Sequence, residues 1–322
     1  MPESAMQVGL LLGGLSTAGE LGELAAEAEA LGYASLWAGD HVAFPSPILD
    51  PFEILSCFAV RTERVRLGTC VYLLALRHPT VVAKMVASLD FVAGGRLVFG
   101  VGVGGEFPGE FRACGVPVTE RGARTNEGIA ALRRLWAGGE ATHRGRVFEI
   151  GPVRLAPSPP QGAGLPIWIG GRTEAALRRA AKLGDGYVGY LLDADGFRQR
   201  MGRIGELAAA AGRPASAVTP ALMTFAIVDR DREQARARAG AVLGAMYGRP
   251  MEGAAARYCI TGTAADCREA VAAYAAAGCE HLILTPLAYG DGLREQIRLL
   301  ADALGLGVSA GKREAHGVRG AR

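Results

Sequence analysis

The sequence predicts a (β/α)8 barrel, an α/β fold in which parallel strands alternate with helices and close into a ring. Apolar segments of strand length alternate with segments of helical periodicity, and this unit recurs eight times along the chain. The 322 residues fit a barrel with insertions, and the half of them that is hydrophobic can fill a large core. Because right-handed crossovers let eight such units close without a free edge, a barrel is favoured over the alternative, a doubly wound open sheet.

The predicted elements follow one another in regular order. The helix expected at 20–31 has apolar residues at helical spacing and acids on its other side, and Pro79 suits the first turn of a later helix. The expected strands are 6–12, 33–38, 65–73, 96–103, 166–169, 186–191, 219–228 and 281–285. The expected helices are 20–31, 51–62, 79–92, 120–136, 174–183, 197–211, 232–246, 264–277 and 293–304.

Two segments interrupt this order. Residues 104–119 lengthen the loop after the fourth strand, and 141–161 predict a hairpin with a Pro-rich link before the fifth. Long loops in compact domains are usually functional or disordered, so we expect both near the mouth of the barrel as partial lids. Residues 1–304 then form a single barrel domain, and 305–322, which lose the periodicity, are expected to be a flexible tail.

Composition excludes several classes of function. The net charge is only +3 and no long basic stripe occurs, which argues against nucleic-acid binding. The six cysteines are scattered, with no CxxC pair and no Cys/His cluster at metal-ligand spacing, so we expect reduced thiols and no metal site. The first residues lack a signal-peptide pattern and no apolar run is long enough to span a membrane, so we expect a cytoplasmic protein.

The most informative short segment is the predicted strand that ends in Asp40 and His41. Ligands bind at the carboxyl ends of the strands in parallel α/β proteins, so polar groups placed just after a strand are candidates for chemistry. His41 is the candidate general acid or base because imidazole titrates close to neutral pH. The alternative is that the pair only caps the loop. His78, directly before Pro79, is a candidate for a supporting role.

Two glycine-rich segments are candidate ligand contacts. Residues 100–106 formally match GxGxxG, but no helix opens directly after them, so a dinucleotide fingerprint is not indicated. We expect these glycines to let a flat ligand lie against the backbone, with Glu106 facing it; tight barrel packing is the alternative. The segment 170–173 (Gly-Gly-Arg-Thr) leads from a strand into a helix, which predicts a phosphate cradle, and Thr173 can cap that helix as well.

Seven segments, taken in order, resemble the bacterial luciferase-like family, and more narrowly its branch that uses the 8-hydroxy-5-deazaflavin coenzyme F420. The resemblance covers residues 6–190 well and the remainder by fold only. The segments are 36–42, 66–71, 76–79, 95–104, 120–127, 166–171 and 184–187.

The resemblance implies a flavin-like ring bound at the carboxyl ends of the strands. Asp40 and His41 match the family's pair beside the ring, Asp40 orienting the imidazole or contacting the ring edge. Cys70 and Val71 match a bulge, often with a non-proline cis peptide, that presses on the back of the ring. The remaining implied contacts are Gly102, Gly104 and Glu106 with the ring or tail, Gly170, Gly171, Arg172 and Thr173 with the phosphate, and Arg124 as a second phosphate contact, which alternatively pairs with Glu120 or Glu127.

The implied activity is hydride transfer between F420 and a small, largely apolar organic substrate, with reduction of a C=C or C=N bond by the reduced cofactor as the main hypothesis. The alternatives are an FMN-dependent monooxygenase using oxygen and a non-catalytic flavin-binding protein. Gly39-Asp40-His41 favours the first, since oxygen-using relatives more often have Glu-His-His there. The resemblance also implies a homodimer, and a partner reductase that supplies reduced cofactor remains open. Aromatic side chains expected to wall the pocket are Phe44, Tyr72, Phe107, Tyr187 and Tyr190.

Overall fold

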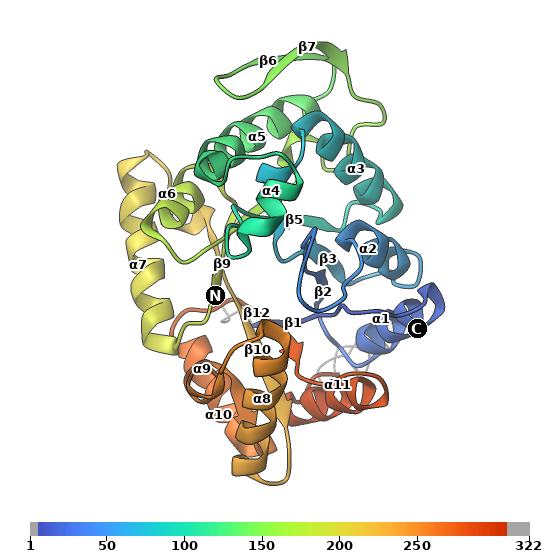
Figure 1. The fold of residues 1–322 in the computed structure, drawn as a ribbon, viewed down its shortest axis with the longest axis vertical. Helices are drawn as coiled ribbons and strands as arrows, with labels where there is room; N and C mark the ends of the chain where they lie inside the picture. Colours follow the sequence, from blue (N-terminus) through green and yellow to red (C-terminus); the bar gives the residue numbers. More distant parts are fainter. Residues whose placement is uncertain (1–5, 308–322) are drawn as a thin grey trace, which may run out of the picture.

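The computed structural model describes residues 6–307 and has the predicted barrel (Figure 1). The strands pair in parallel in the order β12-β1-β2-β3-β5-β8-β9-β10, and pairing of β10 with β12 closes the ring. Closure excludes the open sheet. Of the tail expected at 305–322, residues 308–322 lie outside the described residues.

The elements have the following bounds. The barrel strands are β1 (Gln7–Leu11), β2 (Ser35–Ala38), β3 (Arg66–Thr69), β5 (Leu97–Gly102), β8 (Ile167–Gly170), β9 (Gly186–Tyr190), β10 (Thr219–Val228) and β12 (His281–Pro286). The helices are α1 (Ala18–Ala30), α2 (Pro51–Ala59), α3 (Pro79–Val92), α4 (Pro108–Ala113), α5 (Arg121–Trp136), α6 (Glu174–Leu183), α7 (Ala194–Ala210), α8 (Arg232–Tyr247), α9 (Glu252–Tyr258), α10 (Ala264–Ala276) and α11 (Asp291–Leu304). The shorter strands are β4 (Tyr72–Leu73), β6 (Glu140–Arg144), β7 (Glu149–Arg154) and β11 (Ile260–Gly262).

Side-chain caps explain where several helices begin. Thr17 and Glu20 form a capping box, so α1 starts two residues before the expected position. Asp193 accepts a hydrogen bond from the Gly196 amide at 2.9 Å, so α7 starts at Ala194 rather than at residue 197. Helices α3 and α6 have the predicted bounds.

The structure corrects the sequence prediction at three places. Part of the expected loop 104–119 forms helix α4, which begins at Pro108. The expected strand 65–73 is two strands, β3 and β4, separated by a cis peptide bond between Cys70 and Val71. Helix α9 and strand β11 were not predicted, because a seven-residue Ala-rich helix and a three-residue strand are too short to show a hydrophobic period.

The interior of the barrel is filled by aromatic side chains. The rings of Trp37 and Trp168 lie 5.1 Å apart between centroids, and both side chains are buried. Each needs a glycine on the neighbouring strand: a Cβ at Gly68 would lie 2.3 Å from the Trp37 ring, and one at Gly186 would lie 2.5 Å from Trp168. The amino-terminal half of the barrel is therefore packed, which leaves space for a ligand only at the carboxyl ends of the strands.

The predicted hairpin is present as β6 and β7, and it lies at the periphery next to α5 (Figure 1). Glu127 of α5 holds its turn by accepting backbone hydrogen bonds from Arg146, Val147 and Phe148. No residue of the hairpin lines the cavity described below. The expectation that 141–161 forms a partial lid is therefore wrong, whereas the segment 104–119 does contribute to the cavity wall.

Candidate active site

A cavity of about 770 Å³ opens at the carboxyl ends of the barrel strands. Its size suits a cofactor together with a small substrate. Eleven expected site residues line it, and Arg124 does not. The lining residues are Asp40, His41, Cys70, Val71, Gly102, Gly104, Glu106, Gly170, Gly171, Arg172 and Thr173.

His41 is held by a buried carboxylate. Its Nδ1 lies 3.1 Å from Glu110, which also accepts hydrogen bonds from the backbone amides of Val42 and Ala43. The Phe44 ring stacks on the imidazole with centroids 4.4 Å apart, and Phe107 meets it edge-on. Because Nδ1–H donates to the carboxylate, Nε2 is the nitrogen left to exchange a proton in the cavity.

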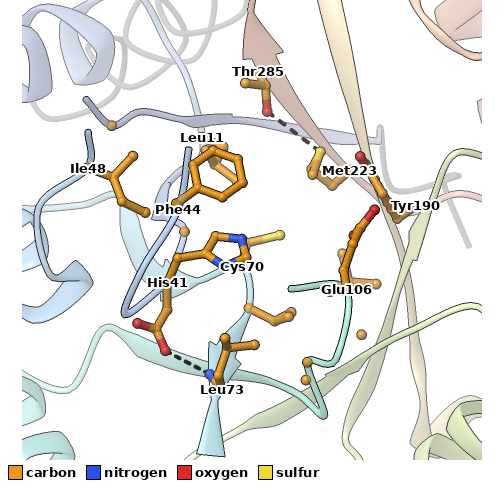
Figure 2. Close-up of a pocket in the computed structure, with 18 of the residues that line it drawn as sticks. Leu11, His41, Phe44, Ile48, Cys70, Leu73, Glu106, Tyr190, Met223 and Thr285 are labelled. Atoms are coloured by element: carbon orange, nitrogen blue, oxygen red, sulfur yellow. Dashed lines mark hydrogen bonds between the residues drawn. The ribbon is translucent and has the colours of Figure 1, made fainter. Parts of the chain in front are cut away.

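Asp40 does not orient His41, contrary to one role expected for it. Its carboxylate accepts two hydrogen bonds from the Arg77 guanidinium and one, at 2.8 Å, from the Leu73 amide, drawn dashed in Figure 2. Burial raises the pKa of Asp40, and its bonds to Arg77 and Leu73 oppose that rise. The carboxylate therefore fixes the backbone that follows Cys70–Val71, and Glu110 has the orienting role.

Val71 and its neighbours form an uncharged part of the cavity wall. The cis peptide implied by the resemblance is present between Cys70 and Val71. The Val71 side chain lies between two glycines, since a Cβ would come within 2.4 Å of it at Gly102 and within 2.7 Å at Gly170. Burial raises the pKa of Cys70 to about 12, so its thiol stays neutral. A planar ring can therefore rest on an uncharged surface.

One end of the cavity is built for an anion. Gly170 and Gly171 lead into the amino terminus of α6, and a Cβ at Gly171 would lie only 2.7 Å from the Ala176 methyl group. Arg121, Arg172 and Arg179 line the same cavity, with the Arg172 guanidinium 5.7 Å from the centre of the Tyr190 ring, and within residues 6–307 none of the three has a carboxylate at ion-pair distance. A helix amino terminus with three such guanidinium groups favours a phosphate.

Arg179 is a buried cation in the wall of the cavity. Its side chain is only 7% exposed, its Nε donates to the Asn126 amide oxygen at 2.6 Å, and burial lowers its pKa. Thr173 caps α6 by accepting a hydrogen bond from the Ala176 amide, so the interpretation as a cap and the interpretation as a phosphate contact are compatible. A buried cation is costly unless it is paired, so an anionic ligand would stabilise this arrangement.

Three expected residues lie in less direct positions. Glu106 is at the rim of the cavity, where it pairs with Arg249 at 3.3 Å. Arg124 lies outside the lining: its Nε donates to the Ala75 carbonyl, and Glu120 is 3.9 Å away, so the alternative pairing with Glu120 is the one observed. His78 caps α3 away from the cavity.

The other end of the cavity is apolar and aromatic. Of the expected wall residues, Phe44 and Tyr190 line it, on opposite sides in Figure 2. Tyr72, Phe107 and Tyr187 do not; Tyr187 is buried and donates to the Gly171 carbonyl. The structure adds side chains from α8 and from the segment after β12, namely Val242, Met246, Tyr247, Leu287 and Tyr289.

Sequence reasoning missed Glu110, Arg77, Arg121 and Arg179. Glu110 acts on His41 across 69 positions, from a helix that had been taken for a loop. Arg77 lies in the segment 76–79 and Arg121 in the segment 120–127, two of the segments that carry the family resemblance. That position was the one signal in the sequence that pointed to them. Within residues 6–307, no group of three or more His, Cys, Asp or Glu side chains is placed to bind a metal ion.

No helix within residues 6–307 has the length and apolar character needed to cross a bilayer.

Comparison with known proteins agrees with this geometry. The chain is 31% identical over 210 residues to an uncharacterised protein of Mycobacterium tuberculosis, a match that covers 59% of this chain and 72% of that protein. It is 32% identical over 177 residues to an F420-dependent glucose-6-phosphate dehydrogenase of Microbacterium testaceum, covering 52% of each.

A solved structure of an F420-dependent secondary alcohol dehydrogenase, in complex with an F420-acetone adduct, superposes with a TM-score of 0.82. The sequences are 20% identical, and the superposition covers 94% of this chain and 99% of that one, which shows a shared fold. A profile of the family described as luciferase-like monooxygenase matches residues 6–281. The resemblance predicted from the seven segments is confirmed, and the chain belongs to the luciferase-like monooxygenase family.

Proposed function

We propose that this protein is a coenzyme F420-dependent oxidoreductase that transfers hydride between the deazaflavin and a small, largely apolar organic substrate, as reduction of a C=C or C=N bond by the reduced cofactor. The observation that carries the proposal is one cavity that combines a helix amino terminus with arginines, an uncharged wall at Val71, and an imidazole held by a carboxylate. The named relative that uses F420 supports the choice of cofactor.

The residues fit a flavin-like group along the length of the cavity. Its phosphate would bind at Gly170 and Gly171, where Arg172, Thr173 and Arg179 supply donors and charge. The ring would lie on Val71, whose side chain packs directly against Gly102 and Gly170 because neither residue carries a Cβ. When bound, a deazaflavin supplies two-electron hydride chemistry at C5 of its ring.

His41 supplies or removes the proton that accompanies the hydride. In the direction of reduction, protonated Nε2 donates to the substrate atom next to the one that accepts hydride; in the reverse direction, neutral Nε2 accepts that proton. Glu110 stabilises the imidazolium and keeps the neutral ring in the tautomer with its hydrogen on Nδ1. Stacking by Phe44 and the edge contact with Phe107 fix the plane of the ring.

FMN-dependent monooxygenation is the competing function, because the same cradle suits the FMN phosphate and the family is described as monooxygenase. A non-catalytic flavin-binding protein has no need of the His41–Glu110 pair. Reconstitution with reduced F420 under anaerobic conditions, and with reduced FMN in the presence of oxygen, separates the three. Loss of the reduced deazaflavin on addition of small apolar enones or imines supports the proposal; substrate-dependent oxygen uptake with reduced FMN supports the monooxygenase; binding without turnover supports the third.

Two neighbouring arginines of α6 give a matched test of the cradle. Arg179 lines the cavity, whereas Arg178 pairs with Glu174 outside it. We expect Arg179→Gln to weaken cofactor binding roughly ten- to a hundredfold, the value of one or two charge-assisted hydrogen bonds, and Arg178→Gln to leave it unchanged. Equal cofactor affinities for the two variants would show that the phosphate binds elsewhere.

A further inference from the structure

Two tyrosine hydroxyls meet in the apolar end of the cavity. Tyr190 is the last residue of β9 and Tyr247 the last of α8, and their hydroxyl oxygens lie 2.7 Å apart. Both side chains line the cavity and both are half-buried. The elements that carry them are 57 positions apart, so this contact is created by the tertiary fold.

The hydroxyl pair has a hydrogen to spare. Two phenols carry two O–H groups, and the bond between them uses one. Neither oxygen has another hydrogen-bond partner within the described residues. Burial raises the pKa of Tyr190 and of Tyr247, so both stay protonated at neutral pH and remain donors. One O–H group of the pair is thus available to a ligand.

The hydroxyl pair adjoins an apolar part of the cavity and has charged side chains beside it. Phe225, Leu287 and Leu243 form a buried cluster against which Tyr190, Tyr247, Val242 and Met246 pack. The Arg172 and Arg249 guanidinium groups lie over the Tyr190 and Tyr247 rings, at 5.7 and 5.8 Å. The Glu106 carboxylate, which pairs with Arg249, also acts on both tyrosines, so charges of both signs lie beside the pair. An otherwise apolar ligand group with an uncharged acceptor oxygen suits these surroundings.

One aromatic ring, Phe44, packs against both the proposed proton donor and the tyrosine pair. Phe44 stacks on His41 on one side and meets the Tyr247 ring edge-on, with centroids 6.2 Å apart, on the other. Figure 2 shows His41 and Phe44 on one side of the cavity and Tyr190 opposite them. A substrate between His41 and the tyrosines would be oriented by its oxygen.

We propose that the Tyr190–Tyr247 hydroxyl pair binds the carbonyl oxygen of the substrate, and that the substrates of this protein are apolar enones or related unsaturated carbonyl compounds. This assignment rests on the proposed function for the identity of the cavity as an active site, and it adds the chemical class of the substrate and the residues that select it. A hydrogen bond that a site is built to make is a strong selector, because its absence leaves a buried donor unsatisfied.

The test compares ligands that differ only in that oxygen. Equilibrium dialysis of the purified protein, with no cofactor and with whichever cofactor binds, measures affinity for acetophenone against ethylbenzene and for 2-acetylnaphthalene against 2-ethylnaphthalene. We expect the ketone-to-hydrocarbon affinity ratio to fall about tenfold from wild type to the double variant Y190F/Y247F. Tyr289→Phe is the matched control, because Tyr289 lines the same cavity without taking part in the hydroxyl pair, and it should leave the ratio unchanged.

Each outcome bears on one proposal alone. An unchanged ratio in Y190F/Y247F, an equal fall in Y289F, or a wild-type protein that binds no aryl ketone would overturn the assignment. Because the readout is binding, failure of deazaflavin turnover together with the expected fall in the ratio would reject the proposed cofactor and leave the carbonyl site standing. Turnover of the deazaflavin with an unchanged ratio would support the proposed cofactor and reject the carbonyl site.

Discussion

Two histidines at opposite ends of the barrel have opposite surroundings. His41 follows β2 at the carboxyl end, with 26% of its side chain exposed and Nδ1 against the Glu110 carboxylate. His281 opens β12 at the amino end, is 2% exposed, and lies edge-on to Trp37 and Trp168. Its partners are neutral: the Ser35 hydroxyl at 2.7 Å and the Gln7 amide oxygen at 3.2 Å.

The two surroundings suit the two histidine side chains to different roles. The ring of His281 has both nitrogens engaged and is surrounded by apolar rings, so burial lowers its pKa to about 4 and it serves packing in its neutral form. His41 has one nitrogen bound to an acid that can stabilise a charge and one nitrogen left to the cavity. A barrel thus separates stability at one end from chemistry at the other.

The largest effect should come from removing the imidazole at the carboxyl end. We expect His41→Gln to lower kcat by roughly a hundred- to ten-thousandfold, as for loss of a general acid or base, with cofactor affinity preserved. His281→Gln should leave kcat nearly unchanged. Steady-state kinetics under anaerobic conditions measure kcat of both variants. A similar loss of kcat in the two variants would contradict the contrast between the two histidines.

The next largest effect should come from protonation of His281, and it concerns the free energy of unfolding rather than kcat. The pKa of His281 is about 4 when folded and ~6.5 when unfolded, so between these values only the unfolded chain takes up the proton. Its contribution to the free energy of unfolding is fully present above pH 6.5 and is lost as the pH falls toward 4, by up to about 3 kcal/mol. Urea unfolding at a series of pH values measures this slope.

His281→Gln should flatten that slope. His78→Asn is the control, because His78 is an exposed cap of α3 and asparagine can also cap a helix. A slope that persists in the His281 variant would assign the pH dependence to other groups and weaken the contrast between the two ends.

A smaller loss is expected from the carboxylate behind His41. Glu110→Gln keeps an acceptor for the Val42 and Ala43 amides but removes the charge that stabilises the imidazolium. We expect kcat to fall roughly ten- to a hundredfold. A kcat equal to that of the wild type would show that Glu110 only holds the loop.

The smallest effect should come from a substitution of Glu106, at the rim of the cavity. Glu106 pairs with Arg249, and both side chains are largely exposed. Exposed ion pairs contribute little to stability, so Glu106→Gln should change both kcat and the equilibrium constant of unfolding by less than about twofold. A tenfold change in cofactor affinity would instead place Glu106 in contact with the cofactor, as the family resemblance implies.

The alternation of elements could be predicted because each long helix and strand shows its own hydrophobic period. The eight barrel strands and the hairpin follow from such local patterns. The seven-residue α9 and the three-residue β11 do not, because their position depends on packing against α8 and β10. Helix starts were displaced where a cap such as Asp193 precedes the apolar pattern.

The candidate site was predictable where a functional side chain adjoins a strand end. Asp40, His41 and the glycines at 170 and 171 were found in this way. Glu110, Arg179 and Tyr247 reach the cavity from helices, and each becomes a candidate site residue only through a contact with a distant segment. The opposite roles of His41 and His281 follow from burial and partners, and a sequence shows neither.

The central claim is that the cavity above Val71 carries out hydride transfer from a deazaflavin to a substrate that receives its proton from His41. The most direct measurement is anaerobic turnover of small apolar enones and imines with reduced F420 that carries deuterium at C5, with mass analysis of the product. We predict that deuterium appears in the product of the wild-type protein and that His41→Gln strongly reduces its yield. A product without deuterium, formed only when oxygen and reduced FMN are supplied, would contradict the account.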